Sequence, residues 1–97
     1  MKLSYTTKAK DDLELAYVWY ERQRTGLGAD FLDCIESSIQ SITTNPEIYQ
    51  IYYADFHGCV VRRFPFVIFY TIESQAIVVH SIFDSRQDIE KRPSQHK

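Results

Sequence analysis

The feature that most constrains this sequence is the stretch of residues 66–72 (FVIFYTI), in which nearly every side chain is apolar. Successive side chains of a β-strand point to opposite faces of the sheet. A strand of this composition needs cover on both faces, whereas a half-exposed antiparallel strand alternates apolar and polar residues. Residues 76–83 have the same character, and Ser74-Gln75 predicts a tight turn that joins the two strands as a hairpin.

Two helices are predicted in the first half of the chain. Residues 8–24 contain neither Gly nor Pro, and their apolar residues recur at the spacing i, i+3, i+4, i+7 of a helix face. We expect Thr7 to cap this helix, and Trp19 and Tyr20 to lie in the core of the helical hairpin, with the margin of that core as an alternative place for Trp19. A second helix runs from Gly28 to Asn45-Pro46, where proline disfavours helical geometry. The short connection between the helices predicts an antiparallel hairpin.

The remaining segments complete an α+β fold. Residues 2–6 read as a first strand, residues 57–64, 65–73 and 76–83 read as three more, and residues 47–56 read as a loop with a possible short strand. The order strand–helix–helix–three strands predicts a helical hairpin packed on one face of a mainly antiparallel four-stranded sheet. We expect a single domain over residues 1–92 and a frayed tail over residues 93–97.

The two helices can cover only one face of such a sheet, so the other face needs a cover of its own. One interpretation is that residues 47–56 and the chain ends fold over it. The other is that a partner protein lies along it, as exposed apolar surfaces commonly indicate. The two interpretations are compatible, and both stay open at this point.

Charge and cysteine usage narrow the classes of function. The net charge is −2, with nine acidic residues against two arginines in residues 11–56. A general nucleic-acid binder presents a broadly cationic face, so this balance disfavours such a protein but leaves room for a small basic cleft. No direct sequence-specific DNA binding is expected. Cys34 and Cys59 lack metal-ligand or disulfide spacing, which predicts reduced thiols and no metal or cofactor. No stretch is apolar enough for a signal peptide or membrane span, so a cytoplasmic protein is expected.

Four motifs carry a resemblance to a known family. They are Trp19-Tyr20-Glu21, residues 26–31 (GLGADF), Asn45-Pro46 and residues 61–70 (VRRFPFVIFY). In this order and spacing the chain resembles the ParE/RelE toxin superfamily, also called plasmid stabilisation proteins. The resemblance implies the toxin of a type II toxin–antitoxin system, neutralised by a cognate antitoxin. It also implies one of two targets: DNA gyrase for ParE-like members, or mRNA in the ribosomal A site for RelE-like members.

Candidate site residues follow from what ribonuclease chemistry requires: a base, cations that stabilise the phosphorane, and an acid. The cations available are Arg62, Arg63 and Arg86. Neighbouring strand residues face opposite ways, so only one of Arg62 and Arg63 is expected to share a cleft with Arg86. These arginines also have simpler roles, because Arg62 and Arg63 can pair with antitoxin carboxylates or the acidic helices, and Arg86 can bind either the C-terminal carbonyls or Asp84.

The ribonuclease interpretation lacks a clear candidate for the general acid. The resemblance implies a histidine just after the last strand, but Asp84 stands there, and Ile89 stands where a proline is common. An exposed aspartate cannot supply a proton near pH 7 as histidine does. His80 is the remaining candidate; strand alternation groups it with Val78, Ile82 and Asp84, and a hydrogen-bonded strand histidine is its simpler interpretation.

The sequence therefore favours a toxin that binds DNA gyrase and has no chemistry of its own. A ribosome-dependent mRNA endoribonuclease is the alternative, and an inactive or retargeted binding module is a third. Contacts with the target or the antitoxin are expected at Arg62, Arg63, Tyr70, Asp84 and Arg86.

Overall fold

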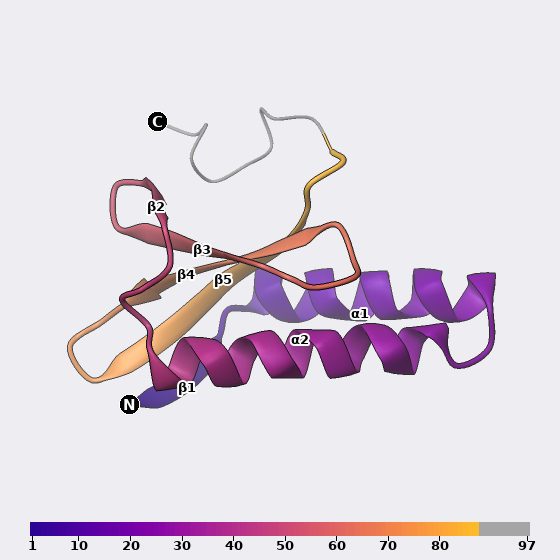
Figure 1. Cartoon of the computed structure of the whole chain (residues 1–97), viewed down its shortest axis with the longest axis horizontal. Helices are drawn as coiled ribbons and strands as arrows, with labels where there is room; N and C mark the ends of the chain where they lie inside the picture. Colours follow the sequence, from indigo (N-terminus) through magenta and orange to yellow (C-terminus); the bar gives the residue numbers. More distant parts are fainter. Residues whose placement is uncertain (88–97) are drawn as a thin grey trace.

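The computed structural model describes residues 1–87 and confirms the α+β class. The elements follow the order β1 (Lys2–Tyr5), α1 (Thr7–Gln23), α2 (Leu27–Thr44), β2 (Ile51–Tyr53), β3 (Phe56–Val60), β4 (Phe66–Ile72) and β5 (Ala76–Asp84). The two helices lie side by side on one face of the sheet (Figure 1). Within residues 1–87, neither helix is long and apolar enough to cross a membrane.

The sheet has five strands rather than the four expected, in the order β1-β5-β4-β3-β2. The extra strand is β2, which arises from the segment expected to be mainly loop and pairs with β3. Three of the four pairings are antiparallel, but β1 pairs with β5 in parallel. The sheet is therefore mixed: the helical hairpin carries the chain from β1 to β2 at the opposite edge, and the antiparallel run from β2 to β5 then brings β5 back beside β1.

Local hydrogen bonds stabilise the helical hairpin at the start of α1 and at the connection between α1 and α2. Thr6, not Thr7, caps α1, and its Oγ1 accepts from the Ala9 backbone N–H at 3.1 Å. At the other end of α1, the Glu21 carboxylate accepts from the N–H groups of Gly26 at 3.0 Å and Gly28 at 2.9 Å. It therefore satisfies the free donors at the start of α2, where the helix dipole also favours negative charge.

Glycine is required at position 28 by the same contact. A Cβ on Gly28 would lie 2.7 Å from the Tyr17 ring and 2.9 Å from Glu21 Oε1. The two helices therefore approach closely where α2 begins, and Gly26 enters that turn with φ +91°.

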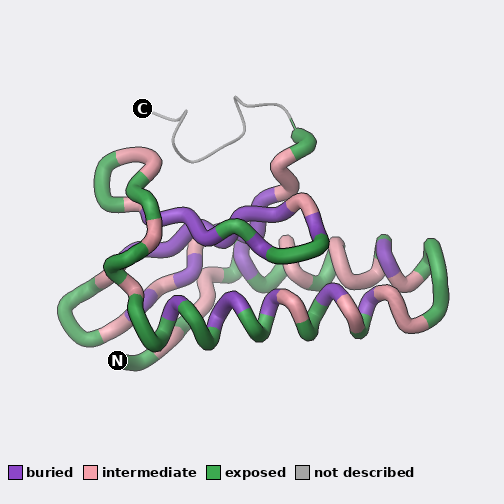
Figure 2. The backbone as a smooth tube through the Cα atoms, viewed as in Figure 1, coloured by how far each residue is buried: buried purple, intermediate pink, exposed green. Residues whose placement is uncertain are grey.

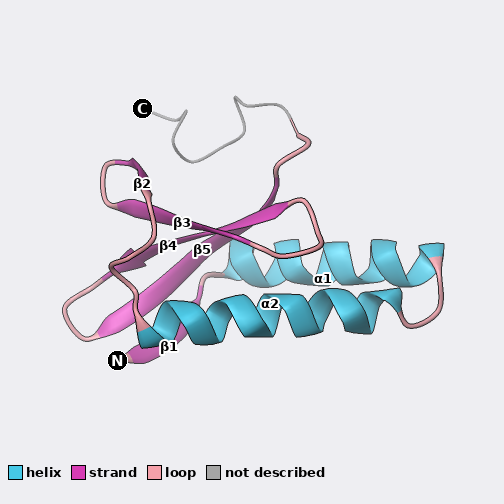
Figure 3. Cartoon of the chain, in the orientation of Figure 1, coloured by secondary structure: helices cyan, strands magenta, loops and turns pink. Residues whose placement is uncertain are grey.

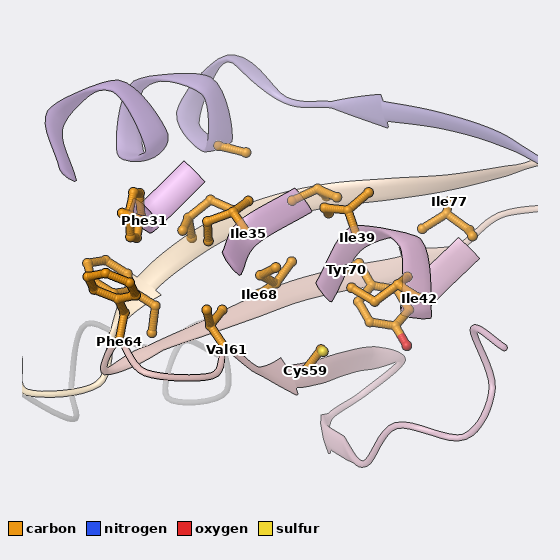
Figure 4. Close-up of a cluster of buried hydrophobic side chains, with 14 of the residues drawn as sticks. Phe31, Ile35, Ile39, Ile42, Cys59, Val61, Phe64, Ile68, Tyr70 and Ile77 are labelled. Carbon is orange, nitrogen blue, oxygen red and sulfur yellow. The ribbon is translucent and has the colours of Figure 1, made fainter. Parts of the chain in front are cut away.

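The main core lies between the helices and the sheet (Figure 4). Buried positions recur along α2 on the side that faces the sheet (Figure 2). Its isoleucines pack with the inward residues of β4 and β5, the most buried of which are Ile68, Tyr70, Ile77 and Val79. Tyr70 is fully buried and its hydroxyl donates to the Pro46 carbonyl at 2.6 Å, so burial raises the pKa of that phenol.

The helix-free face carries a second, smaller core. Val67, Phe69 and Phe83 are buried there, and Tyr52 and Phe56 pack against them. The Tyr52 ring meets Phe69 edge to face at 5.2 Å and crosses β3 at Gly58, where any Cβ would collide with it. Residues 47–56 therefore cover this cluster, as the first interpretation expects, and the part of that interpretation that concerns the C-terminal end lies outside the described residues.

Candidate functional site

A groove opens between α1 and the end of β5, on the helix side of the sheet. Its volume is about 280 Å³. It is lined by Asp12, Leu15, Ala16, Trp19, Tyr20, Phe66, Ile82, Asp84, Arg86 and Gln87. Leu15 and Trp19 lie one helical turn apart on its rim and keep 71% and 50% of their surface exposed. Trp19 therefore lies at the margin of the core, which was the alternative expected for it, whereas Tyr20 is buried.

Two of the charged groups that line this groove, Asp84 and Arg86, form a closed pair, whereas the third, Asp12, accepts from the Ile82 backbone N–H at 3.0 Å and pairs with Lys8. Arg86 donates from Nε to Asp84 Oδ1 at 3.0 Å and from Nη2 to Oδ2 at 2.8 Å, and its backbone N–H donates to Oδ1 at 2.9 Å. The side-chain hydrogen bonds from Arg86 lower the pKa of Asp84, and the same contact raises the pKa of Arg86. The expected pairing of Arg86 with Asp84 is therefore confirmed, and both groups stay charged.

An aromatic row leads away from this pair. The guanidinium of Arg86 lies 5.9 Å from the centre of the Trp19 ring, and Trp19 meets Tyr20 edge to face at 5.0 Å. Tyr20 in turn meets Phe64 edge to face at 4.9 Å, and the guanidinium of Arg63 lies 5.7 Å from the Phe64 ring. The row therefore has one arginine at each end.

Arg62 and Arg63 do not lie in a strand, so the prediction that they face opposite sides of one is wrong. Strand β3 ends at Val60, and both arginines belong to the loop that leads to β4 (Figure 3). Arg63 adopts φ +73°, which a strand residue does not. Its Nη2 lies 4.0 Å from Asp30 Oδ2, and Nη2 of Arg24 lies 3.9 Å from the same oxygen. Arg63 and Arg86 thus occupy separate places rather than one cleft.

His80 is turned away from these arginines. In the pairing of β4 with β5, Phe69 faces Ser81 and Tyr70 faces Val79, so His80 is the extra residue of a bulge. Its Nε2 lies 2.9 Å from Thr71 Oγ1, and its ring contacts Phe56 of the second core at 4.9 Å. The bulge makes the predicted alternation of this strand wrong, and it removes His80 from the face that carries Asp84.

The same bulge changes the sheet face on which the neighbouring apolar residues lie. Ile82 joins Ile77 and Val79 in the main core, and Phe83 joins the second core, whereas simple alternation grouped Phe83 with Ile77 and Val79. Tyr70, which we expected to contact a partner, has no exposed surface, so its role is to hold the core.

Sequence reasoning did not identify Leu15, Trp19 or Arg24 as site residues. Leu15 and Trp19 are spaced i, i+4 and both fall outside the apolar stripe of residues 13, 16, 17 and 20, which is a signal of exposure that the sequence does contain. Arg24 carries no such signal, because its proximity to Arg63 depends on the tertiary fold. Within residues 1–87, no group of three or more His, Cys, Asp or Glu side chains is placed to hold a metal ion.

Comparisons with known proteins bear on the family and the fold of the chain. The family model described as the ParE toxin of the type II toxin–antitoxin system parDE matches residues 3–89. No curated protein sequence gives a significant match. A structure of the chromosomal ParDE TA system from P. aeruginosa has a similar fold, with a TM-score of 0.66 over 87% of this chain and 95% of that chain at 17% identity. The chain therefore belongs to the ParE toxin family of type II toxin–antitoxin systems.

Proposed function

We propose that this protein inhibits growth by binding DNA gyrase in the cytoplasm, and that a cognate antitoxin neutralises it. The observation that carries the proposal is the state of the ionisable groups beside the groove. Asp84 and Arg86 satisfy each other, and the lowered pKa of Asp84 keeps its carboxylate ionised at neutral pH. Neither group is poised to transfer a proton.

The position of His80 argues in the same direction. Cleavage of RNA needs an acid, a base and cations that converge on one phosphate. His80 lies on the helix-free side with Thr71 and Phe56, whereas Asp84 and Arg86 line the groove beside α1. These three candidates do not converge, which favours a toxin that acts by binding.

The exposed residues of the groove fit a protein partner. Leu15 and Trp19 present apolar surface, and Arg86 is held over the indole ring with its charge fixed in place. Tryptophan and arginine are the residue types most enriched among those that dominate protein–protein affinity. We therefore assign this groove as the main contact with gyrase or with the antitoxin.

The test separates binding from catalysis. Purified protein is added to DNA gyrase, and supercoiling and double-strand breaks are measured; in parallel, mRNA cut positions are mapped on ribosomes after induction in cells. We expect inhibition of gyrase, weakened at least tenfold by Trp19→Ala and by Arg86→Ala. The matched control is Ile48→Ala, since Ile48 is 68% exposed but lies after α2, away from the groove.

Each outcome has a consequence. Cuts phased to the ribosomal A site, without an effect on gyrase, would replace the proposal by the endoribonuclease alternative. An absence of both effects and of growth inhibition would leave the inactive or retargeted binding module. For the antitoxin, co-expression of the neighbouring reading frame should restore growth and yield a stable complex, and failure to do so would remove that half of the proposal.

A further inference from the structure

Three arginines outside the groove form a second charged surface, here named the arginine patch: Arg24, Arg62 and Arg63. Arg24 ends α1 and Arg63 lies in the β3–β4 loop, yet both guanidiniums approach the same oxygen of Asp30, at 3.9 and 4.0 Å. Their side chains are 63% and 60% exposed, and Arg62, the residue before Arg63 in the loop, is exposed as well. Segments far apart in the sequence therefore bring like charges together at one point of the surface.

The hydrogen-bonding capacity of this patch is unused within residues 1–87. Distances of 3.9 and 4.0 Å are too long for hydrogen bonds, and no side-chain donor of Arg24, Arg62 or Arg63 has a hydrogen-bond acceptor in that part of the chain. Each guanidinium carries five N–H donors in a planar fork. The Glu21 carboxylate already accepts from two backbone N–H groups, and within residues 1–87 Asp30 is the carboxylate that lies at ion-pair distance from Arg24 and Arg63.

The patch is also held in place by buried neighbours. Val61 and Phe64, on either side of the two loop arginines, are both buried, and the Val61 N–H donates to the Phe66 carbonyl at 2.9 Å to close the loop. The Arg24 N–H donates to the Tyr20 carbonyl at 3.3 Å. The backbone therefore fixes the arginines before any ligand arrives, which lowers the entropy lost on binding.

We propose that the arginine patch binds backbone phosphates of nucleic acid without reading base sequence. Guanidinium forks match phosphate oxygens in a bidentate manner, and phosphate contacts need cations but no apolar core. A protein partner needs that core. The flanking Gln23 and Thr25 are polar and exposed, and the exposed apolar residues of α1 belong to the groove.

The binding is weak and sensitive to salt. The net charge of −2 opposes approach of a polyanion, and the patch itself supplies three cations. Each phosphate neutralised on duplex DNA changes the slope of log affinity against log salt concentration by about −0.9, so the patch gives a slope of about −2 to −3. This inference goes beyond the gyrase proposal and holds or fails without it.

The test uses fluorescence anisotropy of the full purified chain with short mixed-sequence nucleic acids, duplex DNA in one arm and single-stranded RNA in the other, over a range of salt concentrations. Each of Arg24→Gln, Arg62→Gln and Arg63→Gln should weaken binding in both arms and reduce the slope by about one. Asp30→Asn should have the opposite effect and tighten binding severalfold, because it removes the competing carboxylate.

The matched control is Lys10→Gln. It makes the same change in net charge roughly 20 Å from Arg24 along α1, and it should leave the slope unchanged. Residues 88–97 are identical in all variants, so their charges contribute equally. Three results would overturn the inference: no saturable binding at low salt, equal binding by the arginine variants and the control, or a polyglutamate peptide that binds these arginines as tightly as DNA does.

Discussion

The groove beside α1 and the arginine patch use the same side chain in opposite ways. In the groove, Arg86 gives its hydrogen bonds to Asp84, which precedes it by two residues in the sequence, and the pair lies against Trp19. In the patch, Arg62 and Arg63 lie in a loop without an acidic residue, and Asp30 reaches Arg63 only at ion-pair distance. The role of an arginine in this protein therefore depends on whether a carboxylate of the same chain already accepts its hydrogen bonds.

The two regions are nevertheless parts of one packing unit. Phe64, Tyr20 and Trp19 form the aromatic row between them, and Tyr20 also packs on Phe31 of α2 at 5.2 Å. Aromatic pairs of this kind contribute about 0.5–1.5 kcal/mol each beyond their buried area. The row should therefore hold both arginines in place through a single central ring.

The largest effect is expected from removal of that ring. Tyr20→Ala should lower the free energy of unfolding by about 3–5 kcal/mol, because it leaves a cavity among Trp19, Phe31 and Phe64. The measurement is urea denaturation followed by circular dichroism. Trp19→Ala is the control; Trp19 is half exposed, so its loss should be about 1 kcal/mol. Equal losses for the two variants would show that the regions are packed independently.

A smaller effect, dependent on pH, is expected from opening the ion pair of the groove. Asp84→Asn should cost about 1 kcal/mol of stability at neutral pH, a modest value because the Arg86 side chain is 56% exposed. The pKa of Asp84 is lowered from 3.8 in the folded protein, so its contribution is complete above that value. It disappears as the pH falls through the lower folded pKa.

The measurement for this variant is the difference in Tm from the unmodified protein over a pH series. The difference should be constant near neutrality and shrink below about pH 4. Asp30→Asn is the control, because the Asp30 carboxylate is not hydrogen-bonded to either arginine near it, and its change should stay within about 0.5 kcal/mol. A difference for Asp84→Asn that grows in acid would contradict the assigned direction of the pKa shift.

The sequence predicted the order of the elements because the helix stripes and apolar strands are long and periodic. It did not predict β2 as a definite strand, since three residues carry too little pattern. The bulge at His80 was also missed, because it is set by pairing with β4 and not by local preference. The motif containing Arg62 and Arg63 reads as extended, yet the chain turns there so that Val61 and Phe64 both reach the core.

The candidate site was predictable only where partners are close in sequence. Asp84 and Arg86 are two residues apart, and their pairing was foreseen. The approach of Arg24 to Arg63 across the start of α2 depends on the packing of the helical hairpin against the loop. A local pattern cannot contain this information, which is why the arginine patch emerged only from the fold.

The smallest expected effect concerns the backbone of the arginine patch. It separates the contribution of backbone conformation to the free energy of unfolding from the contribution of charge. Arg63 adopts φ +73°, a conformation that costs a residue with a side chain about 1–2 kcal/mol. Glycine avoids this cost but loses more conformational freedom on folding. Arg63→Gly should therefore raise the free energy of unfolding by about 0.5 kcal/mol. Arg62→Gly is the matched control: it removes the same charge from the next residue, which has no positive φ, and should lower stability by about 0.5 kcal/mol. Urea denaturation measures both. Both variants lose one positive charge, so the difference in backbone conformation is expected to give them opposite signs, and equal signs would contradict the stabilising effect expected for glycine at position 63.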